Sequence, residues 1–194
     1  MARKIRERKI KAPNVTIIGE GLTERCYFKH LKSLKGYRYT CKPRNFSQQF
    51  IDDLQKQIDK VLTDDGVAVC VFDADVTRDK PAEKKKLEAM QKKYAGNEQV
   101  VLCDSMPSIE FWFLIHYLNT NKYFASSADV IKILRRYLPD FSKHETYLSK
   151  EKWVVDMIAD GKQNTAMERA KAFGMTGESY SNIYKAFEKF AELE

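Results

Sequence analysis

The stretch of residues 67–75, VAVCVFDAD, constrains the fold more than any other part of the chain. Residues 67–72 are apolar and rich in β-branched side chains, which is typical of a parallel strand buried on both faces. Asp73 and Asp75 follow at once. Ligands of open α/β sheets bind beyond the carboxyl ends of the strands, so both acids are expected at a ligand site. Residues two apart in an extended chain project to the same side, so both can face one cation. Aspartates that open a turn or cap a helix are the alternative interpretation.

The first two-thirds of the chain alternates between strand-like and helix-like segments. Strands are predicted where short β-branched or alternating runs occur, and helices where apolar residues recur every three to four positions. The predicted strands are residues 15–18, 37–42, 67–72 and 99–103, and the predicted helices are residues 23–34, 47–62, 81–95 and 105–118. This alternation predicts an α/β fold, with a parallel sheet of about four strands, right-handed crossovers and helices on both faces.

Only helices are predicted in the last third of the chain. Residues that cap or end helices divide it at Ser127, Pro139, Ser149 and Gly161. The length of 194 residues suits one domain with a small helical addition. We therefore expect a basic arm over residues 1–13, an α/β domain over residues 14–124, and a helical C-terminal region over residues 125–194 that packs on it.

Positive charge is concentrated at the start of the chain. The chain has 34 Lys and Arg residues against 27 Asp and Glu residues, for a net charge of +7. Of this, +5 comes from the first twelve residues, which hold one acid and the basic residues Arg3, Lys4, Arg6, Arg8, Lys9 and Lys11. Such an arm can bind phosphates and speed association with nucleic acid. A solvated tail is the alternative.

The composition argues against a membrane protein. No segment approaches the roughly 20 apolar residues of a membrane-spanning helix, and no secretory signal follows the basic N-terminus. The four cysteines, Cys26, Cys41, Cys70 and Cys103, lack CxxC spacing, and two of them lie in apolar strand-like runs. We therefore expect a cytoplasmic protein with reduced thiols. Homo-oligomer formation stays open.

Three further acids stand out by their positions. Glu20 lies between two glycines after the first predicted strand, where a tight turn would expose it. Glu24 falls in the first turn of the next helix, where the helix dipole alone accounts for a carboxylate. Glu110 lies in an almost wholly apolar helix, where a carboxylate is costly unless it is paired or binds a metal. Free backbone N–H groups at the helix start are its alternative partners. His116, on the same helix, is interpreted as a hydrogen-bonded core residue.

Glu20, Asp73 and Asp75 are expected at the same edge of the sheet. Carboxylates that converge without a basic partner repel one another unless a cation lies between them. Mg²⁺ (or Mn²⁺) is the natural candidate, because it prefers carboxylate oxygens, keeps several waters and bridges protein acids to phosphates. Zinc is disfavoured, since no thiolate or imidazole lies at a useful spacing.

Three segments, in consistent order, resemble the motifs of the RloB-like proteins, a bacterial branch of the Toprim superfamily. They are IIGEGLTERCYFKHL, VCVFDAD and SMPSIEFWFLIHY, all within residues 15–117. The matching family motifs are EG-x-TE-x-x-YF, FD-x-D and P-x-x-E-x-W-x-x-x-H. The chain departs from the pattern twice. Thr77 stands where many Toprim enzymes have a third acid, and the last motif opens with Met106-Pro107-Ser108 instead of Asn-Pro-Cys.

The resemblance implies a Toprim-like (Rossmann-like) domain that hydrolyses phosphodiester bonds of DNA or RNA. In it, Glu20 acts as general acid or base, Asp73 and Asp75 hold Mg²⁺, and Glu24 and Glu110 are supporting acids. The resemblance also implies a role in bacterial anti-phage, abortive-infection or restriction-associated systems. An ATPase partner of the ABC or SMC type is expected there.

Two other functions fit parts of the sequence. The sheet domain can be a non-catalytic regulatory or partner-binding subunit with a vestigial Toprim site. The run VAVCVFDADVT also fits the DxDxT start of haloacid-dehalogenase phosphatases, with Asp73 as nucleophile. That chemistry needs a later acidic pair at further strand ends, and the chain after Cys103 offers none.

Overall fold

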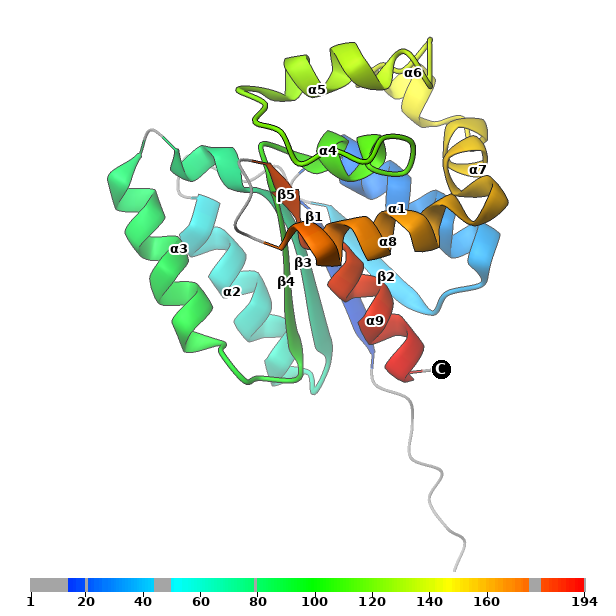
Figure 1. Ribbon diagram of the computed structural model, residues 1–194. Helices are drawn as coiled ribbons and strands as arrows, with labels where there is room; N and C mark the ends of the chain where they lie inside the picture. Colours follow the sequence, from blue (N-terminus) through cyan, green and yellow to red (C-terminus); the bar gives the residue numbers. More distant parts are fainter. Residues whose placement is uncertain (1–13, 20, 44–49, 79, 175–178, 194) are drawn as a thin grey trace, which may run out of the picture.

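The computed structural model describes residues 14–19, 21–43, 50–78, 80–174 and 179–193 (Figure 1). In these ranges the chain forms a five-stranded sheet with the order β2-β1-β3-β4-β5. Four of the strands are parallel: β1 (Val15–Gly19), β2 (Tyr39–Pro43), β3 (Val67–Asp73) and β4 (Val100–Met106). The predicted α/β class with a largely parallel sheet is confirmed.

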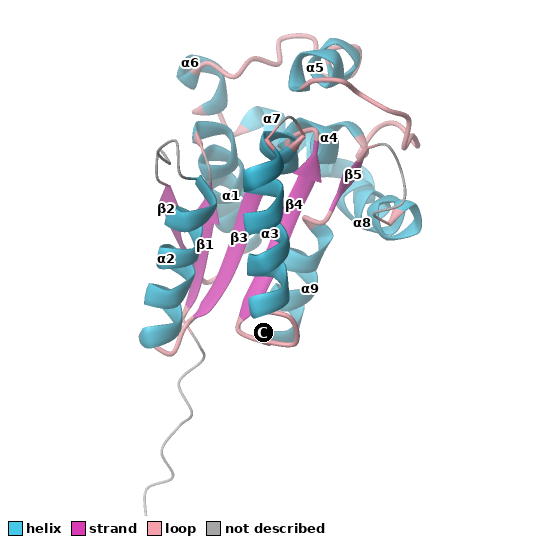
Figure 2. Ribbon diagram, turned by 90° about the vertical axis from the view of Figure 1, so that its left-hand side faces the viewer, coloured by secondary structure: helices cyan, strands magenta, loops and turns pink. Residues whose placement is uncertain are grey.

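Helices cover both faces of the sheet and its carboxyl edge (Figure 2). One face carries α2 (Phe50–Thr63) and α3 (Pro81–Lys93), and the other carries α1 (Leu22–Lys35) and α9 (Tyr184–Leu193). Beyond the carboxyl ends of the strands lie α4 (Ile109–Leu114), α5 (Ser127–Leu134) and α6 (Glu145–Leu148). The remaining elements are α7 (Lys152–Ile158), α8 (Lys162–Phe173) and the 3₁₀ helices η1 (Ala74–Thr77) and η2 (Ala159–Gly161).

The side chains of β3 contribute to two hydrophobic cores. Its odd-numbered residues from Val67 to Val71 pack in a larger core with α1, α4 and the C-terminal helices. Its even-numbered residues from Ala68 to Phe72 pack in a smaller core with α2 and α3. All of them are buried. The strand is therefore buried on both faces, as its unbroken apolar run predicts.

The C-terminal helices share the larger core with the sheet domain. Trp153 of α7 packs against Tyr27 of α1 and Phe113 of α4, with ring centroids 6.1 and 5.3 Å apart. The indole N–H of Trp112 donates a hydrogen bond of 2.8 Å to the hydroxyl of Tyr27. Aromatic contacts of this kind stabilise beyond the area that they bury. The region after residue 125 is thus fixed to the sheet through aromatic packing.

The helices are short. The two longest, α1 and α2, have 14 residues each, whereas a bilayer needs roughly 20. No helix in the described ranges could span a membrane. Gly36 follows the last residue of α1 in the left-handed region, with φ of 71°, a conformation that glycine adopts readily at the end of a helix.

A fifth strand, β5 (Tyr180–Ser181), corrects the expectation that only helices follow residue 126. It pairs antiparallel with the end of β4. Side chains hold it there, because Asp104 of β4 accepts hydrogen bonds of 2.8 Å from the Tyr180 hydroxyl and from the Asn182 amide. Two residues are too few to show strand periodicity in a sequence, so tertiary contacts alone define this strand.

We expect Tyr180→Phe to lower the free energy of unfolding by about 1 kcal/mol, because it leaves one oxygen of the buried Asp104 carboxylate without its donor. Urea denaturation of the variant and the wild type measures this difference. Tyr137→Phe, on an exposed tyrosine, is the matched control and should leave stability unchanged. Equal midpoints for the two variants would contradict a structural role of the Tyr180 hydroxyl.

The predicted helix over residues 105–118 is shorter in the structure. Ser105 and Met106 end β4, where Ser105 lies opposite Asp73 of β3 and Met106 pairs with β5. A cis Met106–Pro107 bond follows, and α4 begins only at Ile109 and ends at Leu114. Pro107 disfavours helical geometry at the residue before it, which is consistent with the extended end of β4.

Candidate active site at the carboxyl edge of the sheet

Asp73 and Asp75 lie at the carboxyl end of β3, in the middle of the sheet. Asp73 is the last residue of the strand, and Asp75 lies in η1 directly after it. Both side chains are partly exposed. A backbone hydrogen bond of 2.9 Å from the N–H of Arg78 to the carbonyl of Asp75 closes the turn. The two acids are therefore placed at the sheet edge where the sequence predicts a ligand site.

Asp73 also fixes the start of α4. Its Oδ1 accepts a hydrogen bond of 2.9 Å from the backbone N–H of Ile109, the first residue of that helix. A helix start has N–H groups without partners inside the helix, and its partial positive charge favours an anion. This contact sets the position of the Asp73 carboxylate relative to Glu110, the next residue of α4.

Glu110 is completely buried, and its partners are side chains rather than the free backbone N–H groups that the sequence also allows. The Ser108 hydroxyl donates a hydrogen bond of 2.6 Å to Oε2. The Nζ of Lys143 lies 3.0 Å from Oε1 as an ion pair. Burying a carboxylate is tolerated where a cation and a hydrogen-bond donor compensate for the lost water. Glu110 is therefore held as part of a charged cluster at the start of α4.

Lys143 is the site residue that the sequence reasoning missed. It lies in the connection between α5 and α6, and its side chain is 48% exposed. Burial lowers the pKa of Lys143, but attraction and a hydrogen bond to Glu110, with attraction to Asp73 and Glu24, outweigh it, so the pKa is raised. The amine is thus a cation that is paired with Glu110 and attracts two further acids. No local pattern around residue 143 marks it, because its partners come from other parts of the chain.

Glu24 is buried in the first turn of α1, where it accepts a hydrogen bond of 3.0 Å from the backbone N–H of Gly21 through Oε2. This is the helix-start arrangement that its position predicts. A Cβ atom at Gly19 would lie only 3.0 Å from the Cβ of Glu24, so the glycine permits the close approach of strand and helix. Glu24 nevertheless lies within electrostatic range of Lys143, so its predicted supporting role is compatible with its capping role.

Glu20 and the basic arm (Arg3, Lys4, Arg6, Arg8, Lys9 and Lys11) lie outside the described residues, so their predicted roles stay predictions. The chain on either side of Glu20 is described, as is the chain from residue 14 onward after the arm. Gly19 ends β1 and pairs with Val71, two residues before Asp73, which brings the neighbour of Glu20 to the same edge. At the opposite edge, the carbonyl of Asn14 accepts the N–H of Val67. The described chain therefore begins about 20 Å from Asp73 along the strands.

The donor chemistry of this edge suits a hard cation. No three His, Cys, Asp or Glu side chains converge to hold a metal within the described ranges, which leave out Glu20. The pair Asp73 and Asp75 offers carboxylate oxygens only. Mg²⁺ is commonly held by one or two carboxylates, with water and substrate phosphate completing its octahedron. The residues present therefore fit Mg²⁺ or Mn²⁺ better than zinc, for which thiolate or imidazole ligands are typical.

His116 is a buried core residue, as predicted. Its Nδ1 lies 2.8 Å from the carbonyl of Trp112, and the ring packs edge-on against the Trp112 indole at 4.8 Å. Because a carbonyl can only accept, the proton is on Nδ1, and Nε2 has no hydrogen-bond partner within the described part of the chain. Burial lowers the pKa of His116 to about 4, with smaller contributions from Arg169 and Lys162.

This pKa gives a testable pH dependence. His116 is neutral in the folded protein down to about pH 4, whereas it binds a proton near pH 6.5 when unfolded. The unfolded state therefore holds more protons between these values, and stability falls as the pH drops from 6.5 to 4. We expect the wild type to lose about 2 kcal/mol more than His116→Asn between pH 7 and pH 5. Urea denaturation at both pH values measures this.

The exposed His144 supplies the control for that experiment. His144→Asn makes the same substitution at a histidine whose side chain is exposed instead of buried. For each protein the change in the free energy of unfolding between pH 7 and pH 5 is compared. A loss of stability in His116→Asn that is the same at both pH values therefore does not affect the result. An unchanged pH dependence in His116→Asn would show that His116 does not titrate as the buried geometry predicts.

Comparison with known proteins identifies a family. No curated protein and no solved structure matches this chain. The family model described as RloB-like protein matches residues 15–189. This range contains the three motifs that indicate the same family from sequence, and it extends beyond them through the C-terminal helices and β5 into α9. The chain belongs to the RloB-like family.

Proposed function

We propose that this chain is a Mg²⁺-dependent nuclease of the Toprim type, which hydrolyses phosphodiester bonds of DNA or RNA. The observation that supports this most is the placement of Asp73 and Asp75 at the carboxyl end of the central strand, beside a fully buried Glu110. Oxygen ligands at this edge are suited to a divalent cation and a phosphate.

The charges around Lys143 support the same proposal. Its ammonium group attracts Glu110, Asp73 and Glu24, so the charges of three acids act at the same place. Carboxylates crowded in this way favour an additional cation. Both Asp73 and Asp75 are partly exposed, so a metal ion and a substrate phosphate can reach them from solvent.

Each residue of the site would have its own role in the reaction. Asp73, held by the N–H of Ile109, and Asp75 would hold Mg²⁺. The bound ion supplies charge neutralisation at the phosphoryl oxygens and lowers the pKa of a coordinated water. Glu20 would move the proton of the attacking water or the leaving oxygen. Glu110 and Lys143 would keep the start of α4, and with it Asp73, in position.

The family resemblance also suggests the biological role of the nuclease. We place the nuclease in a bacterial anti-phage, abortive-infection or restriction-associated system, with an ABC- or SMC-type ATPase as its partner. In such a system the partner can control when the nuclease cuts.

A cleavage assay tests this function. Labelled single- and double-stranded DNA and RNA, including transfer RNA, are incubated with wild type or Asp75→Asn and with Mg²⁺, Mn²⁺ or EDTA. We expect metal-dependent cutting by the wild type and its loss in Asp75→Asn, since a metal ligand is replaced by a neutral amide. Asp129→Asn, on an exposed aspartate of α5, is the matched control and should cut like the wild type.

A calorimetric Mn²⁺ titration of the same proteins separates the remaining outcomes. Metal binding without cutting, lost in Asp75→Asn, would point to an enzyme that needs its ATPase partner. Neither metal binding nor cutting would favour a non-catalytic subunit and would refute the proposed nuclease. Cutting by Asp75→Asn at the wild-type rate would also refute it.

A further inference from the structure

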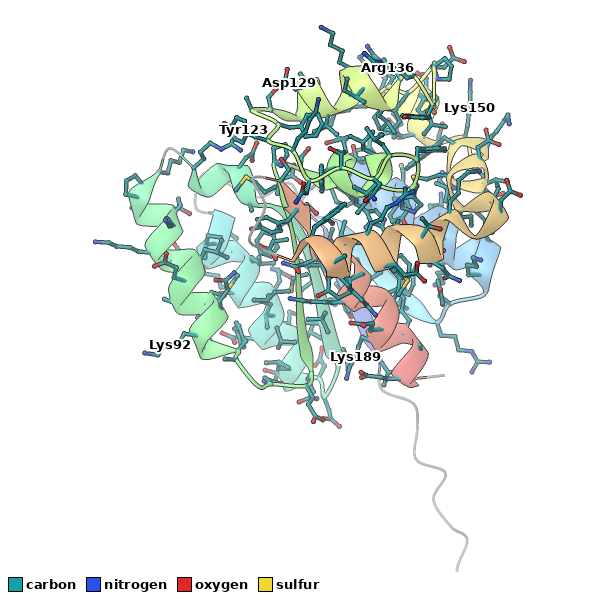
Figure 3. The ribbon with its side chains drawn as sticks, in the orientation of Figure 1. Lys92, Tyr123, Asp129, Arg136, Lys150 and Lys189 are labelled. Carbon is teal, nitrogen blue, oxygen red and sulfur yellow. The ribbon has the colours of Figure 1, made fainter. Side chains whose placement is uncertain are left out.

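Tyr123 is displayed at the surface on a fixed backbone. At 49% exposure it is the most exposed large hydrophobic side chain of the described residues. The next residue, Phe124, is buried against Phe111, with ring centroids 6.1 Å apart, and its N–H donates a hydrogen bond of 3.0 Å to the Ser179 hydroxyl. Figure 3 shows Tyr123 at the edge of the molecule, near the start of α5. The chain is therefore anchored at the neighbouring position while the Tyr123 ring faces solvent.

Arg78 covers one side of this ring. Its guanidinium carbon lies 5.2 Å from the ring centroid, which is within the range of a cation–π contact. The guanidinium also donates to the carbonyls of Ala125 and Phe124 and contacts the sulfur of Met106 at 3.2 Å. These contacts hold both the cation and the loop of Tyr123 in place. A single exposed tyrosine is ordinary at a protein surface. This ring differs because an anchored arginine holds it in one orientation, which prepares it to bind a ligand.

The Arg78–Tyr123 pair lies beside the acid cluster. Arg78 belongs to the turn that contains Asp75, as shown by the hydrogen bond from its N–H to the Asp75 carbonyl. Met106, which its guanidinium touches, follows Ser105, and Ser105 lies opposite Asp73 in the sheet. The Arg78–Tyr123 pair is therefore close to Asp75 through the turn after β3 and close to Asp73 through the end of β4. Lys80 and Lys122, both exposed, lie close in the sequence to Arg78 and Tyr123, respectively.

We propose that Tyr123, backed by Arg78, is a stacking platform for an unpaired nucleobase of a strand that passes the acid cluster. This inference rests on the proposed function, from which it takes nucleic acid as the substrate. Every base has an aromatic face, so stacking on tyrosine is tolerant of sequence. Inside a duplex the neighbouring base pairs cover these faces, so the platform selects single-stranded segments or loops of DNA or RNA.

Equilibrium binding without metal tests the platform separately from cleavage. Fluorescence anisotropy of labelled oligothymidine and oligouridine is measured in EDTA, so that no cutting occurs. We expect Tyr123→Ala to weaken single-strand binding about five- to 150-fold, which is the range for one stacked base. Tyr123→Phe should bind like the wild type because it keeps the ring. A blunt DNA duplex should bind equally to Tyr123→Ala and the wild type.

Tyr137→Ala is the matched control, because Tyr137 is also exposed, at 39%, but stacks on Tyr117 with centroids 5.2 Å apart. It should leave all affinities unchanged. A second readout is direct: in Tyr123→Trp the introduced indole is exposed, whereas Trp112 and Trp153 are buried. Oligothymidine should quench its fluorescence, and Tyr137→Trp should show no quenching.

The outcomes are distinct from those of the nuclease test. Wild-type affinity in Tyr123→Ala, equal weakening of single strands and duplex, or no single-strand binding by the wild type would each overturn the platform. Tyr123-dependent binding in a protein that never cuts with metal would support the platform and refute the nuclease. Comparison of oligothymidine with oligouridine shows whether DNA or RNA is preferred.

Discussion

Asp73→Asn is expected to reduce metal-dependent cleavage at least about a thousandfold while leaving the fold intact. The substitution removes the negative charge that would hold the metal. It keeps an oxygen that can accept the hydrogen bond from the N–H of Ile109, which anchors α4. Cleavage rates at saturating Mg²⁺, together with urea denaturation in EDTA, measure the two effects independently. Stability in EDTA should stay close to that of the wild type, because the amide keeps the hydrogen bond, while the loss of charge both relieves repulsion from nearby acids and gives up attraction to Lys143 and the start of α4.

Asp73→Ala separates the two roles of this residue. It removes the charge and also the acceptor for Ile109, so it should abolish cleavage as Asp73→Asn does and additionally lower the free energy of unfolding by about 1 kcal/mol. If Asp73→Asn unfolds as easily as Asp73→Ala, the carboxylate serves the fold rather than a metal. If Asp73→Asn keeps full cleavage, Asp73 is not a metal ligand.

Lys143→Met is expected to lower the free energy of unfolding in EDTA by about 3 kcal/mol. Removing the ammonium leaves the Glu110 carboxylate fully buried with only the Ser108 hydroxyl among its described partners. Breaking one side of a buried ion pair costs several kcal/mol, and the estimate is at the low end because Lys143 is half exposed. Urea denaturation measures the loss. Lys150→Met, on an exposed lysine nearby in the chain, should be neutral.

The double variant Lys143→Met with Glu110→Gln tests whether the unpaired carboxylate of Glu110 causes this loss of stability. A neutral amide needs no counter-charge, so the double variant should be more stable than Lys143→Met alone. Mg²⁺ should also raise the melting temperature of Lys143→Met more than that of the wild type, because the missing ammonium leaves more negative charge beside Asp73. A wild-type urea midpoint for Lys143→Met would show that the ion pair contributes nothing to stability.

Several features of this fold can be predicted from local sequence patterns. The continuous apolar run of β3 and the alternation of strands with helices follow from which faces of each element are buried, and that information lies in neighbouring residues. The position of Asp73 and Asp75 follows as well, because residues directly after a parallel strand must lie at its carboxyl edge. The burial of His116 was predictable for the same reason, since apolar residues surround it on its helix.

What Glu110 touches could not be predicted. The sequence marks it as an anomalous acid, yet its counter-ion Lys143 lies 33 residues further along the chain, in a connection without periodicity. The partner of Asp73 is a backbone group 36 residues away, and that of Tyr180 is an aspartate 76 residues away. β5 has two residues and the Arg78–Tyr123 contact joins a turn to a loop, so neither leaves a periodic signal.

The sequence by itself therefore determined the α/β class, the family and the edge at which the acids lie. These depend on local hydrophobic periodicity and on motifs of adjacent residues. Only the tertiary structure decided that a lysine from the C-terminal region neutralises Glu110, that Asp73 anchors α4, and that Tyr123 is displayed beside the site. Such contacts join residues that are distant in the chain, and their geometry exists only once the helices have packed on the sheet.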